Sequence, residues 1–474
     1  MTFFSAKLSL NLSLCLVLAA CNTVGPQYQT PVSNLPNTFS TALPTAQQTW
    51  QADWWRTFDD AQLNQLIAAA LQDSPDMAVA LARLQQARSV QRIQDASSAP
   101  VAAVGAKVAS DKISKNSEMF ANLPVKNVNT DFTNHQIGFD ASWEIDLFGR
   151  QQRISEAAQA KLEASAARVH DVRLMLAAEV ARNYFELISN QHRRAIAERN
   201  LSNFSEALRL AKLAYRLGDS GKMEVERAQL AQDQFRANLP ALEMAIQQNY
   251  AALMVLTQRS LPMLQSQLVK AHDLTPLPSA PHAGLPSELL QRRADLRIAE
   301  RELAAASAEI GVAEAALYPR FSLTGNGGWT SIAAGSLLQS ASRNWSIGPQ
   351  ISMPLFNGAK LKGQVAVQKA AYEASLAAYR KAVLNALADV EVALNRLAQS
   401  EQRHQSVREA ETAQKNMLAL LQKQLRAGEI SKIPVLEGEK ALLVQEDGRI
   451  QAHAQSLLAM VSVYKALGGG WQLE

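Results

Sequence analysis

Cysteine is scarce in this 474-residue sequence, which contains only Cys15 and Cys21. Because Cys15 falls within an N-terminal segment that we expect to be removed, the mature chain has one cysteine and no internal disulfide. The seven histidines lack the spacing of a zinc-protease motif. Lysine and arginine exceed aspartate and glutamate by only four, which argues against a nucleic-acid-binding surface. Composition therefore favours neither a disulfide scaffold, nor a metalloenzyme, nor a nucleic-acid partner.

Long hydrophobic runs are also missing beyond the N-terminus. No later stretch approaches the eighteen uninterrupted apolar residues that indicate a spanning helix. Phosphate-binding loops are absent as well, since Gly221-Lys222 lacks their glycine and hydroxyl spacing and the glycines of 325–328 lie inside a strand pattern. We therefore expect no enzymatic activity, no metal and no cofactor. Two routes to a membrane remain, a covalent lipid or β-strands.

The first twenty residues have the pattern of a secretory signal. Lys7 provides a positive charge, and an apolar run dominated by leucine extends from Leu8 to Leu18. The run ends in Leu18-Ala19-Ala20-Cys21, the lipobox of bacterial lipoproteins. We expect Cys21 to become the mature N-terminus, carrying N-acyl and S-diacylglycerol lipid. The alternative is an ordinary signal peptide followed by an incidental cysteine.

The remaining sequence contains an internal duplication. Helical stretches open at Pro75-Asp76 and at Ala294-Asp295, and turn segments 216–219 and 426–429 follow each of them at corresponding places. Each half predicts a helix, a short β region, a long helix, a tight turn and a second long helix. The expected divisions are a signal peptide at 1–20, a lipidated extended N-terminal segment at 21–58, a first repeat at 59–261, a proline-rich extended linker at 262–287 and a second repeat at 288–474.

The long helices carry a coiled-coil period. Apolar residues between Leu376 and Leu397 advance by alternating threes and fours, a mean spacing of about 3.5 residues that is typical of a left-handed supercoil. The helix expected from Arg150 to Arg216 would be roughly 100 Å long, and it needs partners along its whole length. Pro240 is expected to kink the helix that follows the first turn. An ordinary helical bundle is the alternative.

Four segments alternate between apolar and small or polar residues with a period of two, as strands do. They lie at about 101–110, 136–147, 319–330 and 344–355. Each has roughly the 9–11 residues that cross a bilayer. Since four strands cannot close a barrel and open edges are not tolerated in lipid, three copies would have to share one barrel of twelve strands. The alternative is a sheet patch on a soluble helical protein.

These features resemble the outer-membrane efflux proteins, the TolC-like family, in its OprM/NodT-type lipoprotein branch. The resemblance covers essentially all of the mature chain. It rests on motifs at Val24–Tyr28, Trp54-Trp55, Trp143–Arg150, Ala308–Ala313, Tyr318-Pro319 and Tyr464–Trp471. Two positions depart from the family pattern: Ala294 replaces a usual proline, and Gln422 lies near where the branch has an acidic residue lining the tip.

The resemblance implies a mainly α fold with a small β part and two internal repeats per chain. It implies a homotrimeric twelve-stranded transmembrane β-barrel continuous with a long periplasmic α-helical coiled-coil barrel. The chain would be lipid-anchored in the outer membrane of a Gram-negative bacterium. It would export drugs or other small toxic compounds with a periplasmic adaptor (a membrane fusion protein) and an inner-membrane pump of the resistance-nodulation-division (RND) type. The alternatives are a type I secretion duct, or a periplasmic coiled-coil adaptor or scaffold lipoprotein without a pore.

The two tight turns are the candidate functional site. Glycine permits the left-handed conformation with which helices commonly end, so each turn is expected to form a periplasmic tip. In a trimer the turns would place six arginines and six acids in one ring. We expect pairs between copies to hold the tip shut until an adaptor docks. The alternative is solvated turn charges. The residues of the expected gate and adaptor contact are Tyr215, Arg216, Gly218, Asp219, Gln422, Arg426, Gly428 and Glu429.

Overall fold

The computed structural model describes residues 23–32, 35–41, 52–114, 130–269, 273–281 and 283–469. The chain divides into two compact units. We call them the strand unit (Met1–Pro31, Gln85–Ala164 and Glu300–Ala378) and the hairpin unit (Val32–Leu84, Ser165–Ala299 and Tyr379–Glu474). Cys21 lies outside the described residues.

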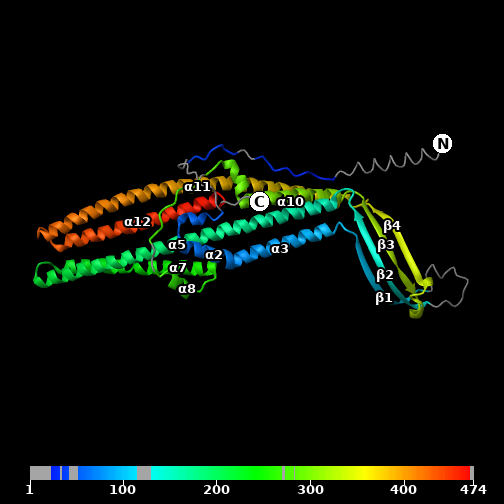
Figure 1. Ribbon diagram of the computed structural model, residues 1–474, viewed down its shortest axis with the longest axis horizontal. Coiled ribbons are helices and arrows are strands. Elements are labelled where there is room, and N and C mark those ends of the chain that lie inside the picture. Colours follow the sequence, from blue (N-terminus) through cyan, green and yellow to red (C-terminus); the bar gives the residue numbers. More distant parts are fainter. Residues whose placement is uncertain are drawn as a thin grey trace. The chain divides into compact units, whose positions relative to one another are not determined.

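The strand unit contains one four-stranded antiparallel sheet with the order β1-β2-β3-β4 (Figure 1). The strands are β1 (Val101–Lys112), β2 (Asp131–Ile145), β3 (Arg320–Ser331) and β4 (Arg343–Ser352), and two 3-10 turns, Ala334–Ser336 and Ser340–Ser342, lie between the last two. The second and fourth strands end earlier than expected. Leu147 donates its backbone N–H to Ile145 in a turn that leads to Gly149, and Pro354 has no N–H for a ladder.

Pairing in the sheet sorts the side chains by polarity. Phe139 lies opposite Val104 and Gly327, and Gly327 lies opposite Trp345, so this row is mainly apolar. The adjacent row, on the other face, joins Asp140 to Asn326. Close packing of the strands requires glycine at position 138, because a Cβ there would lie 2.7 Å from the carbonyl oxygen of Gly327. One face is thus apolar and the other small or polar, as the alternation of the sequence predicts.

The N-terminal segment of the strand unit is held by helix side chains. Arg153 on α5 (Arg150–Leu217) is 4 % exposed, and it donates from Nε to the carbonyl oxygen of Val24 at 3.1 Å and from Nη2 to that of Gly25 at 3.2 Å. The hydroxyl of Tyr28 donates at 2.7 Å to Glu300 on α10 (Ala294–Ala315). Burial raises the pKa of Tyr28. These contacts fix residues 23–31 without any helix or strand of their own.

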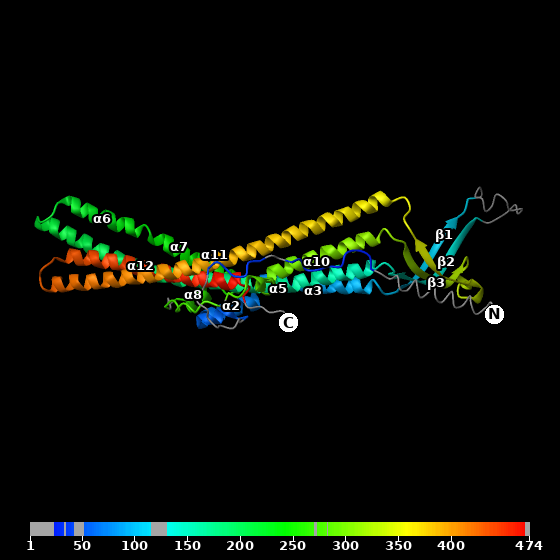
Figure 2. The same ribbon diagram turned by 90° about the horizontal axis from the view of Figure 1, so that it is seen from above.

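The hairpin unit is helical. Its helices, with those it shares with the strand unit, are α2 (Ala61–Asp73), α3 (Pro75–Ala96), α5, α6 (Lys222–Arg236), α7 (Leu239–Thr257), α8 (Leu261–Gln267), α9 (Leu289–Arg292), α10, α11 (Gly358–Arg426) and α12 (Lys432–Ala466). The two longest, α5 and α11, have 68 and 69 residues. Figures 1 and 2 show that α5 turns back into α6 and α11 into α12 at the same end of this unit.

An aromatic core stabilises the hairpin unit. Trp54 stacks on Tyr464 with 5.1 Å between ring centroids, and Phe58 lies 5.1 Å from Phe185. Residues Trp54–Phe58 form a 3-10 helix, so the expectation that 21–58 is extended throughout is wrong at its end. Burial of these large rings explains the difference, because an extended segment could not place Trp54, Trp55 and Phe58 against one core.

Proline positions explain two further differences. The helix after the first turn is broken and not merely kinked, because α6 ends at Arg236 and α7 begins at Leu239 with Pro240 in its first turn. The linker expected to be extended at 262–287 begins inside α8, where Pro262 occupies the first turn and is tolerated. It ends with a 3-10 turn, Pro286–Glu288.

No helix among the described residues is long and apolar enough to cross a membrane.

Candidate functional site: the hairpin turns

The first hairpin turn ends α5 in a Schellman motif. Gly218 has a φ of 82°, its N–H donates to the carbonyl of Tyr215 at 3.1 Å, and the N–H of Asp219 donates to that of Ala214 at 2.9 Å. Nothing lies within 4 Å of the position that a Cβ on Gly218 would occupy. Glycine is therefore required by backbone conformation and not by crowding.

The second turn repeats the motif at the end of α11. Gly428 has a φ of 75°, its N–H donates to the carbonyl of Leu425 at 3.0 Å, and the N–H of Glu429 donates to that of Gln424 at 3.0 Å. The returning helices α6 and α12 begin four residues after Gly218 and Gly428, at Lys222 and Lys432. The left-handed glycines predicted at both turns are confirmed.

The charged residues of the turns project from the hairpins. Arg216, Asp219, Arg426 and Glu429 are exposed, and none of them makes an ion pair with another described residue. Tyr215 is 48 % exposed and Gln422 is half-buried, and they share no hydrogen bond within the described chain. Within the described part of one chain, the side chains of the expected gate thus form no ion pair or hydrogen bond with one another. The gate therefore remains a prediction about contacts between neighbouring copies.

Behind the turns, polar contacts join α5 to α12. Lys432 lies 2.7 Å from Glu206, Arg193 lies 2.9 Å from Asp447, and Arg199 pairs with Glu446. Hydrogen bonds from Arg209 and Lys432 lower the pKa of Glu206 to about 2. Sequence reasoning missed these pairs because their partners are more than 220 residues apart.

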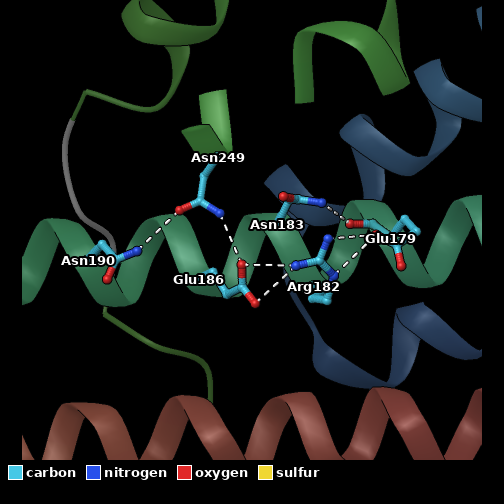
Figure 3. Close-up of polar contacts among 6 residues, drawn as sticks. All are labelled: Glu179, Arg182, Asn183, Glu186, Asn190 and Asn249. Carbon is cyan, nitrogen blue, oxygen red and sulfur yellow. Dashed lines mark hydrogen bonds and ion pairs between the residues drawn. The ribbon is translucent and has the colours of Figure 1, made fainter. Parts of the chain in front are cut away.

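A second polar network runs along α5 farther from the turns (Figure 3). Arg182 lies 2.7 Å from Glu179 and 3.2 Å from Glu186. Asn249 on α7 donates to Glu186 at 3.1 Å and accepts from Asn190 at 3.2 Å. Hydrogen bonding to Glu179 is the main cause that raises the pKa of Arg182. Both carboxylates are therefore already occupied by Arg182 and its neighbours.

A histidine pair lies between α11 and α12. The rings of His404 and His453 are 4.7 Å apart, and Nε2 of His453 is 2.8 Å from the carbonyl oxygen of Thr275. Burial, the neighbouring His453 and nearby arginines lower the pKa of His404 to about 4. Burial therefore favours the neutral form of both histidines over the protonated form.

Comparisons with known proteins match this architecture over most of the chain. Residues 66–258 and 285–469 match a family described as outer membrane efflux protein. The pyoverdine export outer membrane protein OpmQ of Pseudomonas aeruginosa is 31 % identical over 98 % of this chain and 97 % of its own length. The cation efflux system protein CusC of Escherichia coli is 29 % identical over 97 % of this chain and 98 % of its own.

Solved structures agree with the sequence matches. The outer-membrane channel OprN has a TM-score of 0.84 and 31 % identity, covering 95 % of this chain and all of OprN. The open state of the MtrE outer membrane channel of Neisseria gonorrhoeae has a TM-score of 0.80 and 27 % identity, covering 95 % of this chain and 98 % of MtrE.

Proposed function

The chain belongs to the outer membrane efflux protein family, and from this we propose that three copies form the exit duct of a tripartite efflux pump. The sheet carries the proposal. Its outer strands, β1 and β4, have no further strand beside them among the described residues, and large apolar side chains such as Val104 (84 % exposed) and Trp345 (78 % exposed) are uncovered. Three such sheets would pair their edges into twelve strands and turn the apolar face to lipid.

The long hairpins would continue this barrel as a helical tunnel in the periplasm. Each chain would contribute two similar helix–sheet–hairpin repeats, which the matching Schellman motifs at Gly218 and Gly428 support. Helices as long as α5 and α11 gain stability chiefly from partners along their length. Neighbouring copies would supply those partners on the exposed helix faces.

A lipid on Cys21 would tether each copy to the outer membrane. The segment that begins at Thr23 supports this, because Arg153 on α5 binds the carbonyl oxygens of Val24 and Gly25, only three and four residues after the cysteine. In cells fed labelled palmitate, the wild-type chain should take up label and a Cys21→Ser chain should not. Equal labelling of the two chains would refute the lipid site.

A periplasmic adaptor would dock at the turns, with an inner-membrane pump of the RND type behind it. Exposed apolar side chains beside the turns support a docking role, among them Leu217 and Met223 on the first hairpin and Leu420 on the second. The cargo would be drugs or other small toxic compounds. Relatives are named for the export of toluene, antibiotics and cations, which supports efflux without choosing among these.

The turns would also form a gate. In a trimer the unpaired Arg216 and Arg426 of one copy could meet Asp219 and Glu429 of the next, and several weak pairs would together bias a two-state closure. Arg426→Glu should therefore raise single-channel conductance in a planar bilayer, whereas Arg426→Lys should match the wild type. A mutant that conducts as the wild type does would place the gate elsewhere.

Export itself is tested in a bacterial strain that lacks its own outer-membrane efflux channels. Expression of this chain with a cognate adaptor and pump should restore resistance to several dyes and antibiotics. A chain that reaches the outer membrane as a trimer and restores no resistance would contradict the proposed function.

A further inference from the structure

A groove on the hairpin unit is lined by three helices that are distant in sequence. α5 contributes Ala178 to Arg182, α11 contributes Arg396 to Arg403, and α12 contributes Gln455 to Lys465. The volume is about 520 Å³, which lies within the range of small-molecule sites. This groove is distinct from the hairpin turns, because α5 and α11 end at residues 217 and 426.

Positive charge predominates in the groove. Its lining holds four cationic side chains, Arg182, Arg396, Arg403 and Lys465, but only one carboxylate, Glu179. Arg396 and Arg403 are two turns apart on one face of α11, because residues seven positions apart on a helix are aligned. The lining therefore has two aligned cations on α11, one on α5 and one on α12.

Glu179, the single carboxylate of the lining, does not neutralise these four cations. Glu179 is held by Arg182 at 2.7 Å, and Arg182 also contacts Glu186 (Figure 3). Arg396, Arg403 and Lys465 make no ion pair with any residue of the described ranges. Arg403 donates to the neutral amide oxygen of Gln455 at 2.8 Å. Three cations therefore face the groove, and no carboxylate of the described residues lies within ion-pairing distance of them.

Two neighbouring hollows of the hairpin unit contain as many carboxylates as cations, unlike this groove. The first of them holds equal numbers of cations and carboxylates, namely Arg293, Arg396, Lys465, Asp171, Asp295 and Asp389. There Arg293 is fixed by Asp295 at 2.7 Å and by Asp389 at 3.1 Å. Burial raises the pKa of Asp171, and the nearby Arg293 and Lys465 lower it in part. The second hollow contains Arg193 and Asp447, which pair at 2.9 Å.

Apolar side chains share the lining with the cations. Ala178, Leu458, Ala459 and Val461 form part of the wall. An arginine guanidinium binds a carboxylate or sulfonate with two parallel hydrogen bonds, and an apolar wall covers a hydrophobic body. We propose that this groove binds amphipathic organic anions, and that compounds of this class are cargo of the duct. Only their role as cargo rests on the proposed export function.

The test measures binding to the purified full-length protein in detergent by calorimetry. The probe is naphthalene-1,5-disulfonate, and its uncharged counterpart is 1,5-dihydroxynaphthalene. Wild type should bind the disulfonate at least tenfold more tightly than the diol, and Arg396→Gln/Arg403→Gln should bind the disulfonate at least tenfold more weakly than wild type. Arg193→Gln, which removes a paired arginine from a different hollow, should bind as wild type does.

Three results would overturn the proposal: equal affinity of the wild type for both probes, unchanged affinity in the double variant, or a double variant whose copies separate. The last would show that the arginines join copies of the chain, and a mass measurement on the same sample detects it. Restored drug resistance without probe binding would refute the groove alone. Probe binding by a chain that restores no resistance would refute export and leave the anion site standing.

Discussion

Aromatic side chains have opposite surroundings in the two units. In the hairpin unit Trp54 and Phe58 are each 1 % exposed and pack against Tyr464 and Phe185. In the strand unit Trp345 is 78 % exposed on the apolar face of the sheet. The hairpin unit thus buries a core within one chain, whereas the described residues of one chain leave the apolar face of the sheet uncovered. Substitutions of single residues test this difference between the two units.

Replacing Trp54 should give the largest loss of stability. Trp54→Ala removes a fully buried ring, and such changes cost about 3–5 kcal/mol. The free energy of unfolding, measured by denaturant titration in detergent, should fall by this amount. Trp345→Ala is the control, and it should change the value by no more than roughly 0.5 kcal/mol because its ring is already uncovered. Equal losses would remove the contrast between the units.

Gly218→Val tests the turn conformation with a smaller expected effect. A side chain in the left-handed region costs about 1–2 kcal/mol, and amide exchange at the end of α5 should report this loss. Gly221→Ser should be neutral or stabilising, since Gly221 has a φ of −82° and Ser431 occupies the same place before α12. Loss of protection in both variants would point to a role other than backbone conformation.

Acid should weaken the packing around the histidine pair. The pKa of His404 is about 4 in the folded chain, against 6.5 for a free histidine. The stability that neutral His404 contributes is therefore complete above pH 6.5 and declines as pH falls toward 4. His404→Gln should flatten the unfolding midpoint across this window, with a residual slope from His453, whose pKa is also lowered. An unchanged slope in the variant would refute the assignment.

The smallest effect is expected for a contact between the two hairpins. Lys440 on α12 lies 4.9 Å from the ring centroid of Phe204 on α5, a contact of about 0.5–1 kcal/mol at an exposed site. Lys440→Gln should lower the free energy of unfolding by that amount, and Lys440→Arg should preserve it. A larger loss from Lys440→Gln would mean that the hairpins depend on each other more than this contact explains.

Much of the fold could be predicted from local sequence patterns. Alternation at 136–147 identified β2, and glycines 218 and 428 identified both turns, because strand period and left-handed geometry are properties of neighbouring residues. Pro240 indicated a disturbed helix but not the full break between α6 and α7. The 3-10 helix at Trp54–Phe58 depends on tertiary packing. The cationic groove could not be predicted at all, since Arg182, Arg396 and Lys465 meet only when three distant helices are in register. The ion pair between Arg193 and Asp447, 254 residues apart, could not be predicted for the same reason.

The mass of the folded assembly tests the central claim most directly. Native mass spectrometry of the detergent-extracted protein should give three chains, because the uncovered edges of β1 and β4 are proposed to pair with those of neighbouring copies. A monomer in which all four strands remain protected from amide exchange would show that one sheet is stable alone, and it would contradict the shared barrel.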